Sequence, residues 1–183
     1  MMESLDGYIE GENHDLSWHN VDEEFNTFAA LQMREADTIV MGRKTYQLME
    51  NFWPSKEGLE GDPVVAKIMN NTLKIVFSKT LEKVIEREQW KNVTLVKNNI
   101  VEEIKKLKQK NGKDIIVLGS NNFCVTLLEN KLLDEIRVMI NPVVIGKGTP
   151  LFYGLKEKIK LSVEKTREFK NGNILLYLVP QNT

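Results

Sequence analysis

Cysteine is almost absent from this chain of 183 residues, which has only Cys124. A single cysteine excludes a disulfide within the chain and a cysteine-rich metal site. The segment around it, "NFCVTLLEN", is apolar, and no histidine lies near it in the sequence. These surroundings favour a cysteine that packs in the core over a nucleophilic one.

Long apolar runs and an excess of one charge are lacking too. No apolar run approaches the roughly 18 residues that a membrane span needs. The first residues, "MMESLDGYIEG", show no basic segment followed by an apolar one, so we expect no signal peptide and a cytoplasmic protein. The chain has 25 basic and 26 acidic residues and a net charge of -1, which argues against a nucleic-acid or membrane partner.

Histidine is also scarce. The two histidines, His14 and His19, are five positions apart and therefore do not share one face of a helix. No cysteine or carboxylate pattern accompanies them, so we expect no metal site.

Helix-like and strand-like segments alternate along the first two-thirds of the chain. Apolar residues recur at helical spacing over residues 22–36, and "NIVEEIKKLKQKNG" is an amphipathic helix that Asn99 can cap and Gly112 can end. Strands are expected in "DTIVM", "LKIVFS", "VTLVK" and "DIIVLG", and further helices in "KTYQLMENF", "PVVAKIMNN" and "NNFCVTLLEN". This order predicts an α/β fold with a mostly parallel sheet covered on both faces.

The last third is richer in strands. The segments "LLDEIRVMINPVVIG", "IKLSVEKTREF" and "ILLYLV" read as strands, and "KNGN" as a hairpin turn, which adds antiparallel strands at one edge. Residues 52–63 are rich in proline and glycine and are expected to form a loop between helices. Because periodic segments continue on both sides of that loop, we expect one domain over residues 1–183.

Two strand ends have the composition of an anion site. In "TIVMGRKTYQLM" a strand is followed by a glycine, two cations and a helix start, and such a start offers free N–H groups and a positive dipole end to a phosphate. The same pattern also suits a solvated helix start. The strand in "DIIVLGSNNF" likewise ends in glycine and small polar residues, and ligands of α/β sheets gather at the carboxyl ends of strands. Together they suggest a ligand with more than one phosphate.

Five segments, in order, resemble the dihydrofolate-reductase-like superfamily, and within it the reductase domain of the bacterial riboflavin-biosynthesis deaminase/reductase and its small stand-alone relatives. They are "SLDGYIEG", "VMGRKTY", "VFSKT", "VLGSNNF" and "NPVVIGKGTPLF". The resemblance implies a three-layer α/β/α fold with antiparallel C-terminal strands. It also implies an NADPH-dependent reductase of a heterocyclic, pterin- or pyrimidine-like small molecule.

The resemblance also implies a set of cofactor-binding residues. Gly42, Arg43, Lys44 and Thr45 would hold phosphates of NADPH, with Arg43 or Lys44 near the 2′-phosphate. Ser78 and Lys79 would flank the adenosine end. The pyrophosphate would lie along Gly119, Ser120, Asn121 and Asn122, and the nicotinamide near Ser4, Leu5 and Asp6.

The chain departs from the family pattern at its N-terminus and at the position of the proton donor. The family has an apolar strand before "SLDG", and since this chain begins Met-Met-Glu, that first strand is expected to be missing. A proton donor early in the first long helix would be Glu23 or Asp22. Glu23 also suits a helix-capping pair with Asn20, and the residues alone allow either role.

Two classes of function therefore stay open. One is the NADPH-dependent reductase, and the other is a non-catalytic dinucleotide-binding or interaction protein on the same fold. The apolar strands of the last third, and the riboflavin-branch resemblance, favour a homodimer in either case.

Overall fold

The computed structural model describes residues 1–119 and 121–181, which form two compact units. One unit comprises residues 1–25 together with the chain from residue 121 onward, and the other comprises residues 26–120. The boundary falls inside helix α1 (Glu23–Glu35). Each unit has its own four-stranded sheet and its own buried core.

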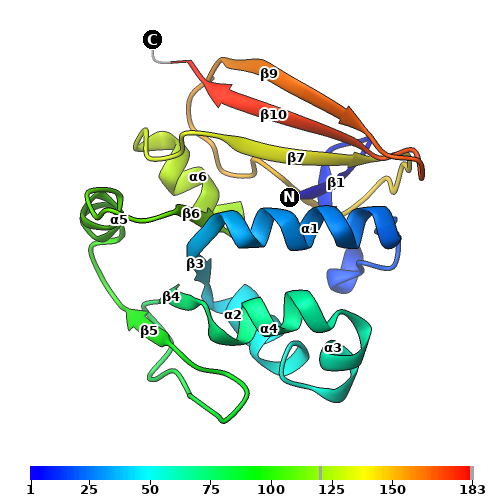
Figure 1. Cartoon of the computed structure of the whole chain (residues 1–183). Coiled ribbons are helices and arrows are strands. Elements are labelled where there is room, and N and C mark those ends of the chain that lie inside the picture. The colour runs from blue at the N-terminus through cyan, green and yellow to red at the C-terminus, as the bar shows by residue number, and fades with distance from the viewer. Residues whose placement is uncertain (120, 182–183) are drawn as a thin grey trace. The chain divides into compact units, whose positions relative to one another are not determined.

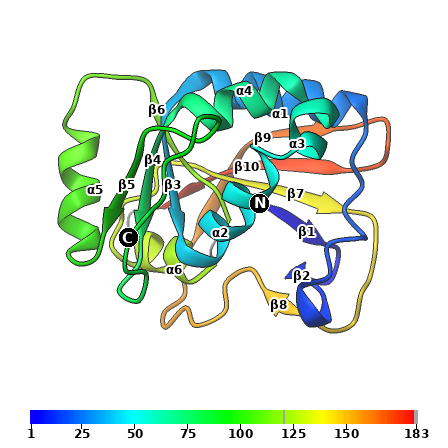
Figure 2. The same cartoon turned by 90° about the horizontal axis from the view of Figure 1, so that it is seen from below.

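The unit of residues 26–120 is built on a parallel sheet. Its strands are β3 (Ala36–Gly42), β4 (Leu73–Phe77), β5 (Val93–Val96) and β6 (Asp114–Val117), in the order β5-β4-β3-β6 (Figure 2). Every neighbouring pair is parallel, as the alternation of strands and helices predicts. The helices of this unit are α2 (Arg43–Phe52), α3 (Lys56–Gly61), α4 (Pro63–Asn71) and α5 (Ile100–Lys108).

The other unit contains a mixed sheet in the order β1-β7-β10-β9. Its strands are β1 (Met2–Ser4), β7 (Ile136–Asn141), β9 (Leu161–Glu168) and β10 (Ile174–Pro180) (Figure 1). β1 runs parallel to β7, and β10 runs antiparallel to both β7 and β9. This unit also holds helix α6 (Asn121–Glu129), the short helix η1 (Glu12–His14) and the antiparallel pair of β2 (Tyr8–Glu10) with β8 (Thr149–Pro150). The α/β class, with a mostly parallel sheet and antiparallel C-terminal strands, is thus confirmed.

The structure corrects the expected loss of the first strand. Met2, Glu3 and Ser4 form β1, whose partners in β7 are Met139, Ile140 and Asn141. The segment lacks an apolar run, so its sequence gave no strand signal. It is extended because the backbone of β7 provides hydrogen-bonding partners along one side, which no local pattern can reveal.

Three local expectations were also wrong. The predicted loop at residues 52–63 contains α3, which begins after the N-cap Ser55, whose Oγ accepts a hydrogen bond from the N–H of Gly58 at 3.2 Å. Asn99 precedes α5 with a left-handed backbone, and its side chain makes no capping hydrogen bond. α5 ends at Lys108, four residues before the glycine that was expected to end it.

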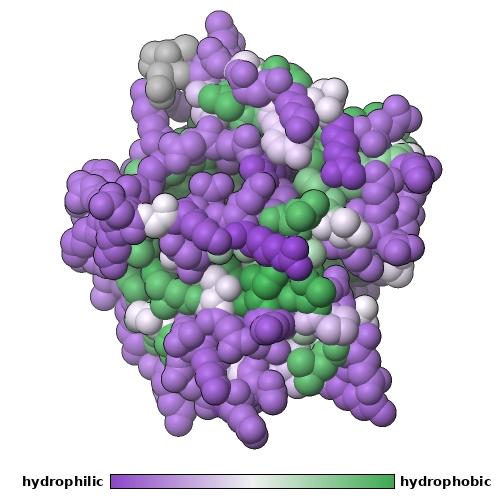
Figure 3. All heavy atoms as spheres, in the orientation of Figure 1, coloured by the Kyte–Doolittle hydropathy of each residue, from purple (hydrophilic) through white to green (hydrophobic). Residues whose placement is uncertain are grey.

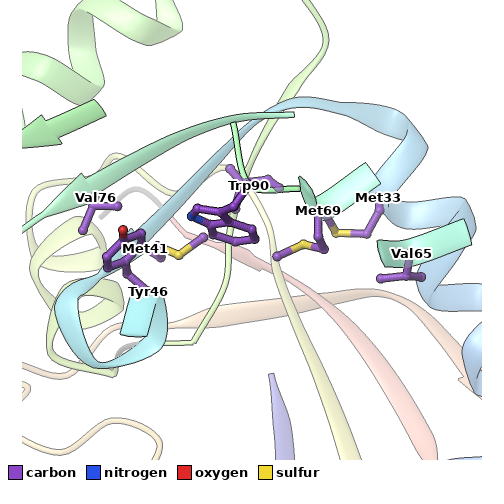
Figure 4. Close-up of a cluster of buried hydrophobic side chains, with 8 residues drawn as sticks. Met33, Met41, Tyr46, Val65, Met69, Val76 and Trp90 are labelled. Carbon is purple, nitrogen blue, oxygen red and sulfur yellow. The ribbon is translucent and has the colours of Figure 1, made fainter. Parts of the chain in front are cut away.

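The core of the parallel-sheet unit joins aliphatic, sulfur-containing and aromatic side chains. Trp90 and Tyr46 are almost fully buried and lie beside residues from β3, β4 and α4 (Figure 4). The other buried members are Met33, Ile39, Met41, Val65, Met69 and Val76. The mixed-sheet unit has a smaller core around Val138, Leu151 and Leu178.

The face of the molecule drawn in Figure 3 is mainly polar. Hydrophilic side chains cover most of the face shown in Figure 3, with smaller hydrophobic areas between them. Of the helices within residues 1–119 and 121–181, none is long and apolar enough to cross a membrane. Val163 of β9 and Ile174 of β10 are 58% and 44% exposed. The homodimer expected from the apolar strands of the last third stays a prediction that sedimentation would check.

Lys74 is the unusual member of the interior of the parallel-sheet unit, because it is charged and fully buried. Its Nζ donates to the backbone oxygens of Met69 at 2.7 Å, Asn70 at 3.3 Å and Thr72 at 2.7 Å, which lie at the C-terminal end of α4. The same nitrogen lies 4.5 Å from the centroid of the Trp90 ring. Burial lowers the pKa of Lys74 to about 8.

This lowered pKa predicts that stability depends on pH. An exposed lysine has a pKa of about 10.4, so between the two values the unfolded chain binds more protons and stability rises with pH. Relative to Lys74→Met, the parent protein should gain about 2 kcal/mol in the free energy of unfolding from about pH 7 to about pH 10. Urea unfolding at several pH values measures this gain. Lys67→Met, at an exposed position of α4, should not alter the pH dependence. A difference between the parent and Lys74→Met that is constant with pH would contradict the prediction.

Candidate cofactor cradle and ligand loop

The carboxyl ends of the parallel strands bring together most of the predicted phosphate-binding residues. Gly42, at the end of β3, is in register with Phe77, at the end of β4. Val40 of β3 pairs with Val117 of β6, and its carbonyl accepts a hydrogen bond from the N–H of Leu118 at 3.1 Å. The segments that follow β3, β4 and β6 therefore begin at one edge of the sheet.

Helix α2 begins at this edge with two exposed cations. Gly42 is its N-cap and has an extended backbone, and Arg43 and Lys44 form the start of the first turn. No acidic residue lies in that turn, so its positive charge is not offset locally. A helix N-terminus with two cations and no carboxylate attracts anions.

Gly119, which follows β6, is packed closely against α2. It has a left-handed backbone with φ of 61°, and a Cβ added at this position would lie 2.6 Å from Oγ1 of Thr45. Any larger residue would therefore be strained by its backbone and would collide with the start of α2. Only glycine lets the backbone after β6 come so near to α2, which makes Gly42, Arg43, Lys44, Thr45 and Gly119 one cradle.

The other predicted cofactor residues have different settings. Ser78 follows β4, and its Oγ accepts hydrogen bonds from the N–H groups of Thr80 at 3.2 Å and Leu81 at 3.0 Å, so it shapes a turn. Lys79 is exposed beside it. The structure leaves Ser120 outside the described residues, so the prediction for that residue stays untested.

Asn121 and Asn122 open α6 in the mixed-sheet unit. The side-chain oxygen of Asn121 accepts a hydrogen bond from the N–H of Asn122 at 2.6 Å, and its Nδ2 donates to the carbonyl of Pro150 at 3.2 Å. Asn121 thus links the start of α6 to β8. Asn122 is exposed.

The residues predicted near the nicotinamide form a hydrogen-bonded turn after β1. Ser4 is fully buried, and its Oγ donates to Oδ1 of Asp6 at 2.7 Å and accepts from the N–H of Tyr8 at 3.1 Å. Oδ1 of Asp6 also accepts from the N–H of Ile145 at 3.2 Å, and Oδ2 accepts from that of Gly146 at 2.8 Å. The hydrogen bond from Ser4, followed by those from the two backbone groups, lowers the pKa of Asp6 below its usual value. Asp6 is therefore ionised at neutral pH.

The two candidate proton donors, Asp22 and Glu23, differ in their surroundings. Oδ1 of Asp22 accepts a hydrogen bond from the N–H of Phe25 at 2.8 Å, so Asp22 caps α1. The predicted capping pair of Asn20 with Glu23 is therefore wrong. Glu23 is exposed. Asn20 instead donates its backbone N–H to Oδ1 of Asn141 at 2.9 Å.

Sequence reasoning missed a cluster of asparagines around Asn20. Nδ2 of Asn20 donates to the carbonyl of Asn171, and the side chain of the fully buried Asn173 donates back to the carbonyl of Asn20 at 2.8 Å. With Asn141, these residues tie the segment before α1 to the β9–β10 turn and to the end of β7. Next to them, Glu24 accepts from Nη2 of Arg167 at 2.9 Å. The repeated asparagines were the available signal, but the partners are more than a hundred residues apart.

The comparisons with known proteins agree with this fold. A family model for the RibD C-terminal domain matches residues 1–175. The chain belongs to the RibD C-terminal domain family. YyaP, an uncharacterized protein of Bacillus subtilis (strain 168), is 35% identical to this chain over 171 residues. The match covers 92% of this chain and 86% of YyaP.

Solved structures extend the comparison. A candidate riboflavin biosynthesis protein from Shewanella sp. PV-4 matches with 25% identity and a TM-score of 0.74, covering 100% of this chain and 97% of that one. The diaminohydroxyphosphoribosylaminopyrimidine deaminase/5-amino-6-(5-phosphoribosylamino)uracil reductase of Thermotoga maritima matches with 18% identity and a TM-score of 0.71. The match covers 98% of this chain and 55% of the Thermotoga chain, and at this identity it establishes the fold alone.

The two neighbouring carboxylates at the start of α1, Asp22 and Glu23, provide a matched pair for a test. Asp22→Ala removes the cap and should lower the free energy of unfolding by about 1 kcal/mol. Glu23→Ala removes an exposed carboxylate and should change it by only about a few tenths of a kcal/mol. Urea unfolding of the two variants measures both values. Equal losses would mean that the capping hydrogen bond contributes little.

Proposed function

We propose that the protein is an NADPH-dependent reductase of a heterocyclic, pyrimidine- or pterin-like small molecule. The observation that carries the proposal is the cradle at the end of β3, where Gly119 leaves no room for a side chain beside a cationic helix start. Family membership supports the reductase class, and the names of the Shewanella and Thermotoga proteins point to riboflavin chemistry and to a pyrimidine ring.

The cradle suits the diphosphate and the 2′-phosphate of NADPH. Backbone N–H groups at the start of α2 would face a phosphate, and the close packing of Gly119 on Thr45 brings the backbone after β6 beside that helix start. Arg43 and Lys44 are exposed and would hold the 2′-phosphate by charge-assisted hydrogen bonds. When bound, NADPH supplies the hydride for the reduction.

The protein's own part in the reaction is mainly positioning. In this proposal the start of α2 and Gly119 hold the phosphates. Asp6 is ionised and accepts three hydrogen bonds from protein groups, so it would not donate the proton that reduction of a C=N bond requires. We propose that water or the substrate provides this proton.

A non-catalytic dinucleotide-binding protein is the second candidate. The observation that favours it is the setting of the predicted acids, because Asp22 is engaged as a helix cap and Glu23 is exposed. Oxidation of NADPH in the presence of pyrimidines and pterins separates the two. Tight binding of NADPH without turnover across such a panel would favour the second candidate.

The cationic start of α2 predicts a preference for NADPH over NADH. Arg43→Ala and Lys44→Ala should each weaken NADPH binding, and the more important of the two by about ten- to a hundred-fold, because a charge-assisted hydrogen bond contributes about 1.5–3 kcal/mol. NADH binding should change much less, since NADH lacks the 2′-phosphate. Calorimetric titration with both cofactors measures the effect, and Lys67→Ala serves as the control.

Equal dissociation constants for NADPH and NADH in the parent protein would contradict this assignment. The same conclusion would follow if Arg43→Ala and Lys44→Ala weakened the two cofactors alike.

A further inference from the structure

One residue, Asp37, interrupts the regular pairing of β3 with β6. Ala36 of β3 pairs with Asp114 of β6. The next pair joins Thr38 to Ile115, so two steps along β3 match one step along β6. Asp37 is the extra residue of this β-bulge, and it is exposed although Ala36 and Thr38 are buried. Because bulges are rare between parallel strands, this one marks a position where the pairing is specifically set.

The side chain of Asp37 supplies the hydrogen-bond acceptor at the bulge. Its Oδ2 accepts from the N–H of Lys113 at 2.7 Å, and its Oδ1 accepts from Oγ1 of Thr38 at 2.8 Å. The hydrogen bond from Lys113, followed by the one from Thr38, lowers the pKa of Asp37 below its usual value. Nζ of Lys113 in turn donates to the carbonyl of Arg34 at 3.0 Å, near the end of α1. The residue before β6 is thus tied to the junction of α1 and β3 by its backbone and by its side chain.

Gly112 leaves the space that the carboxylate of Asp37 occupies. A Cβ added at Gly112 would lie 2.5 Å from Oδ2 of Asp37, the oxygen that accepts the N–H of Lys113. This distance is below the 3.0 Å that real Cβ atoms keep, so a larger residue would displace the carboxylate. The glycine that does not end α5 therefore has another role, which is to let Asp37 reach β6.

The register set at the bulge extends to the cradle, because β6 depends on one partner. Among the strands that the structure describes, β6 ends the order β5-β4-β3-β6 and pairs with β3 alone. Beyond the bulge Val40 pairs with Val117, and Gly119 follows two residues later. Without the bulge, Val40 would pair with Leu118 and Gly119 would move by one residue, about 3.3 Å along β3. Such a shift would break the close packing of Gly119 on Thr45.

We propose that Asp37 is a positioning residue for the cradle, which fixes the register of β6 on β3 and thereby the place of Gly119 beside the start of α2. Asp37 lies at the amino end of β3 and the cradle begins at its carboxyl end. The carboxylate therefore acts through the strand pair and does not contact the cofactor. The inference rests on the proposed function, because that function assigns NADPH to the cradle.

Calorimetric titration of three folded variants with NADPH tests this role. Asp37→Ala removes both acceptor oxygens and should weaken binding by about three- to ten-fold, because the apparent affinity falls with the fraction of molecules in which Gly119 is in place. Gly112→Ala, which displaces the carboxylate, should weaken binding in the same range. Asp37→Asn keeps one oxygen for the N–H of Lys113, and its amide can donate to the hydroxyl of Thr38. This variant should bind NADPH nearly as tightly as the parent protein.

Glu86 provides a matched control at the other edge of the parallel sheet. Its Oε1 accepts a hydrogen bond at 2.9 Å from the N–H of Val93, the first residue of β5. Glu86→Ala removes the same kind of contact as Asp37→Ala, but from an edge strand that carries no residue of the cradle. Its affinity for NADPH should equal that of the parent protein. Equal weakening by the two variants would indicate general damage and would overturn the positioning role.

Hydrogen exchange gives a local readout that a general loss of stability would not produce. At the cradle end of the β3–β6 pair, the N–H of Leu118 donates to the carbonyl of Val40 at 3.1 Å. At the matching end of the β4–β5 pair, the N–H of Ser78 donates to the carbonyl of Val96 at 3.1 Å. Asp37→Ala should speed exchange at Leu118 and leave exchange at Ser78 unchanged. Equal acceleration at both sites, or none at Leu118, would overturn the inference.

The double variant tests whether Gly112 and Asp37 act together. Adding Gly112→Ala to Asp37→Ala should cost little further affinity for NADPH, because the carboxylate that the new methyl group would displace is already absent. Full additivity would overturn this shared action. If Asp37→Ala fails to fold, Gly112→Ala still tests the inference, since it keeps every hydrogen-bonding group of the bulge.

Failure of the inference and failure of the proposed function give different results. If the parent protein binds NADPH, and Asp37→Ala and Gly112→Ala bind it equally tightly, the positioning role is overturned and the proposed function stands. If the parent protein does not bind NADPH, the proposed function fails and the inference fails with it.

Discussion

The parallel pairing of β5, β4, β3 and β6 is the constraint on which the candidate cradle depends. Parallel strands in register end together, so the segments after β3, β4 and β6 start at one edge whatever their sequences are. A shift of β6 by two residues would move Gly119 away from Thr45 and separate the two halves of the cradle. The register is in turn maintained by fully buried residues such as Ile39, Val40 and Val76.

In the mixed-sheet unit, polar side chains connect segments that strand pairing does not join. Asp6 holds a distant loop, and Asn20, Asn141 and Asn173 connect three segments through amide hydrogen bonds. Amides and carboxylates can satisfy several backbone groups at once, so a few of them replace regular secondary structure where the chain is irregular. Such a network fixes the path of a loop.

Periodicity and turn residues were sufficient to predict most elements and the fold class. The apolar run of β3 and the 3.6-residue period of α5 depend on residues that are close together in the chain, so both can be read directly from the sequence. The strand β1 could not be predicted in this way, because Met2–Ser4 is extended only by pairing with β7. The cap at Asp22 and the anchor at Asp6 were missed for a related reason. Several nearby polar residues could serve equally well, and only the folded backbone decides which N–H group each carboxylate meets.

The charged residues of the edge strand β9 affect how two molecules of this protein can pair their sheets. Its outward sequence includes Glu164, Lys165, Arg167 and Glu168, and an edge strand offers its backbone to any other edge strand that approaches. Two copies of β9 aligned antiparallel about Thr166 would set Glu164 against Glu168 and Lys165 against Arg167. A register centred on any of the four charged residues would set that residue against its own copy. In these registers like charges oppose each other, which disfavours these alignments of two β9 edges.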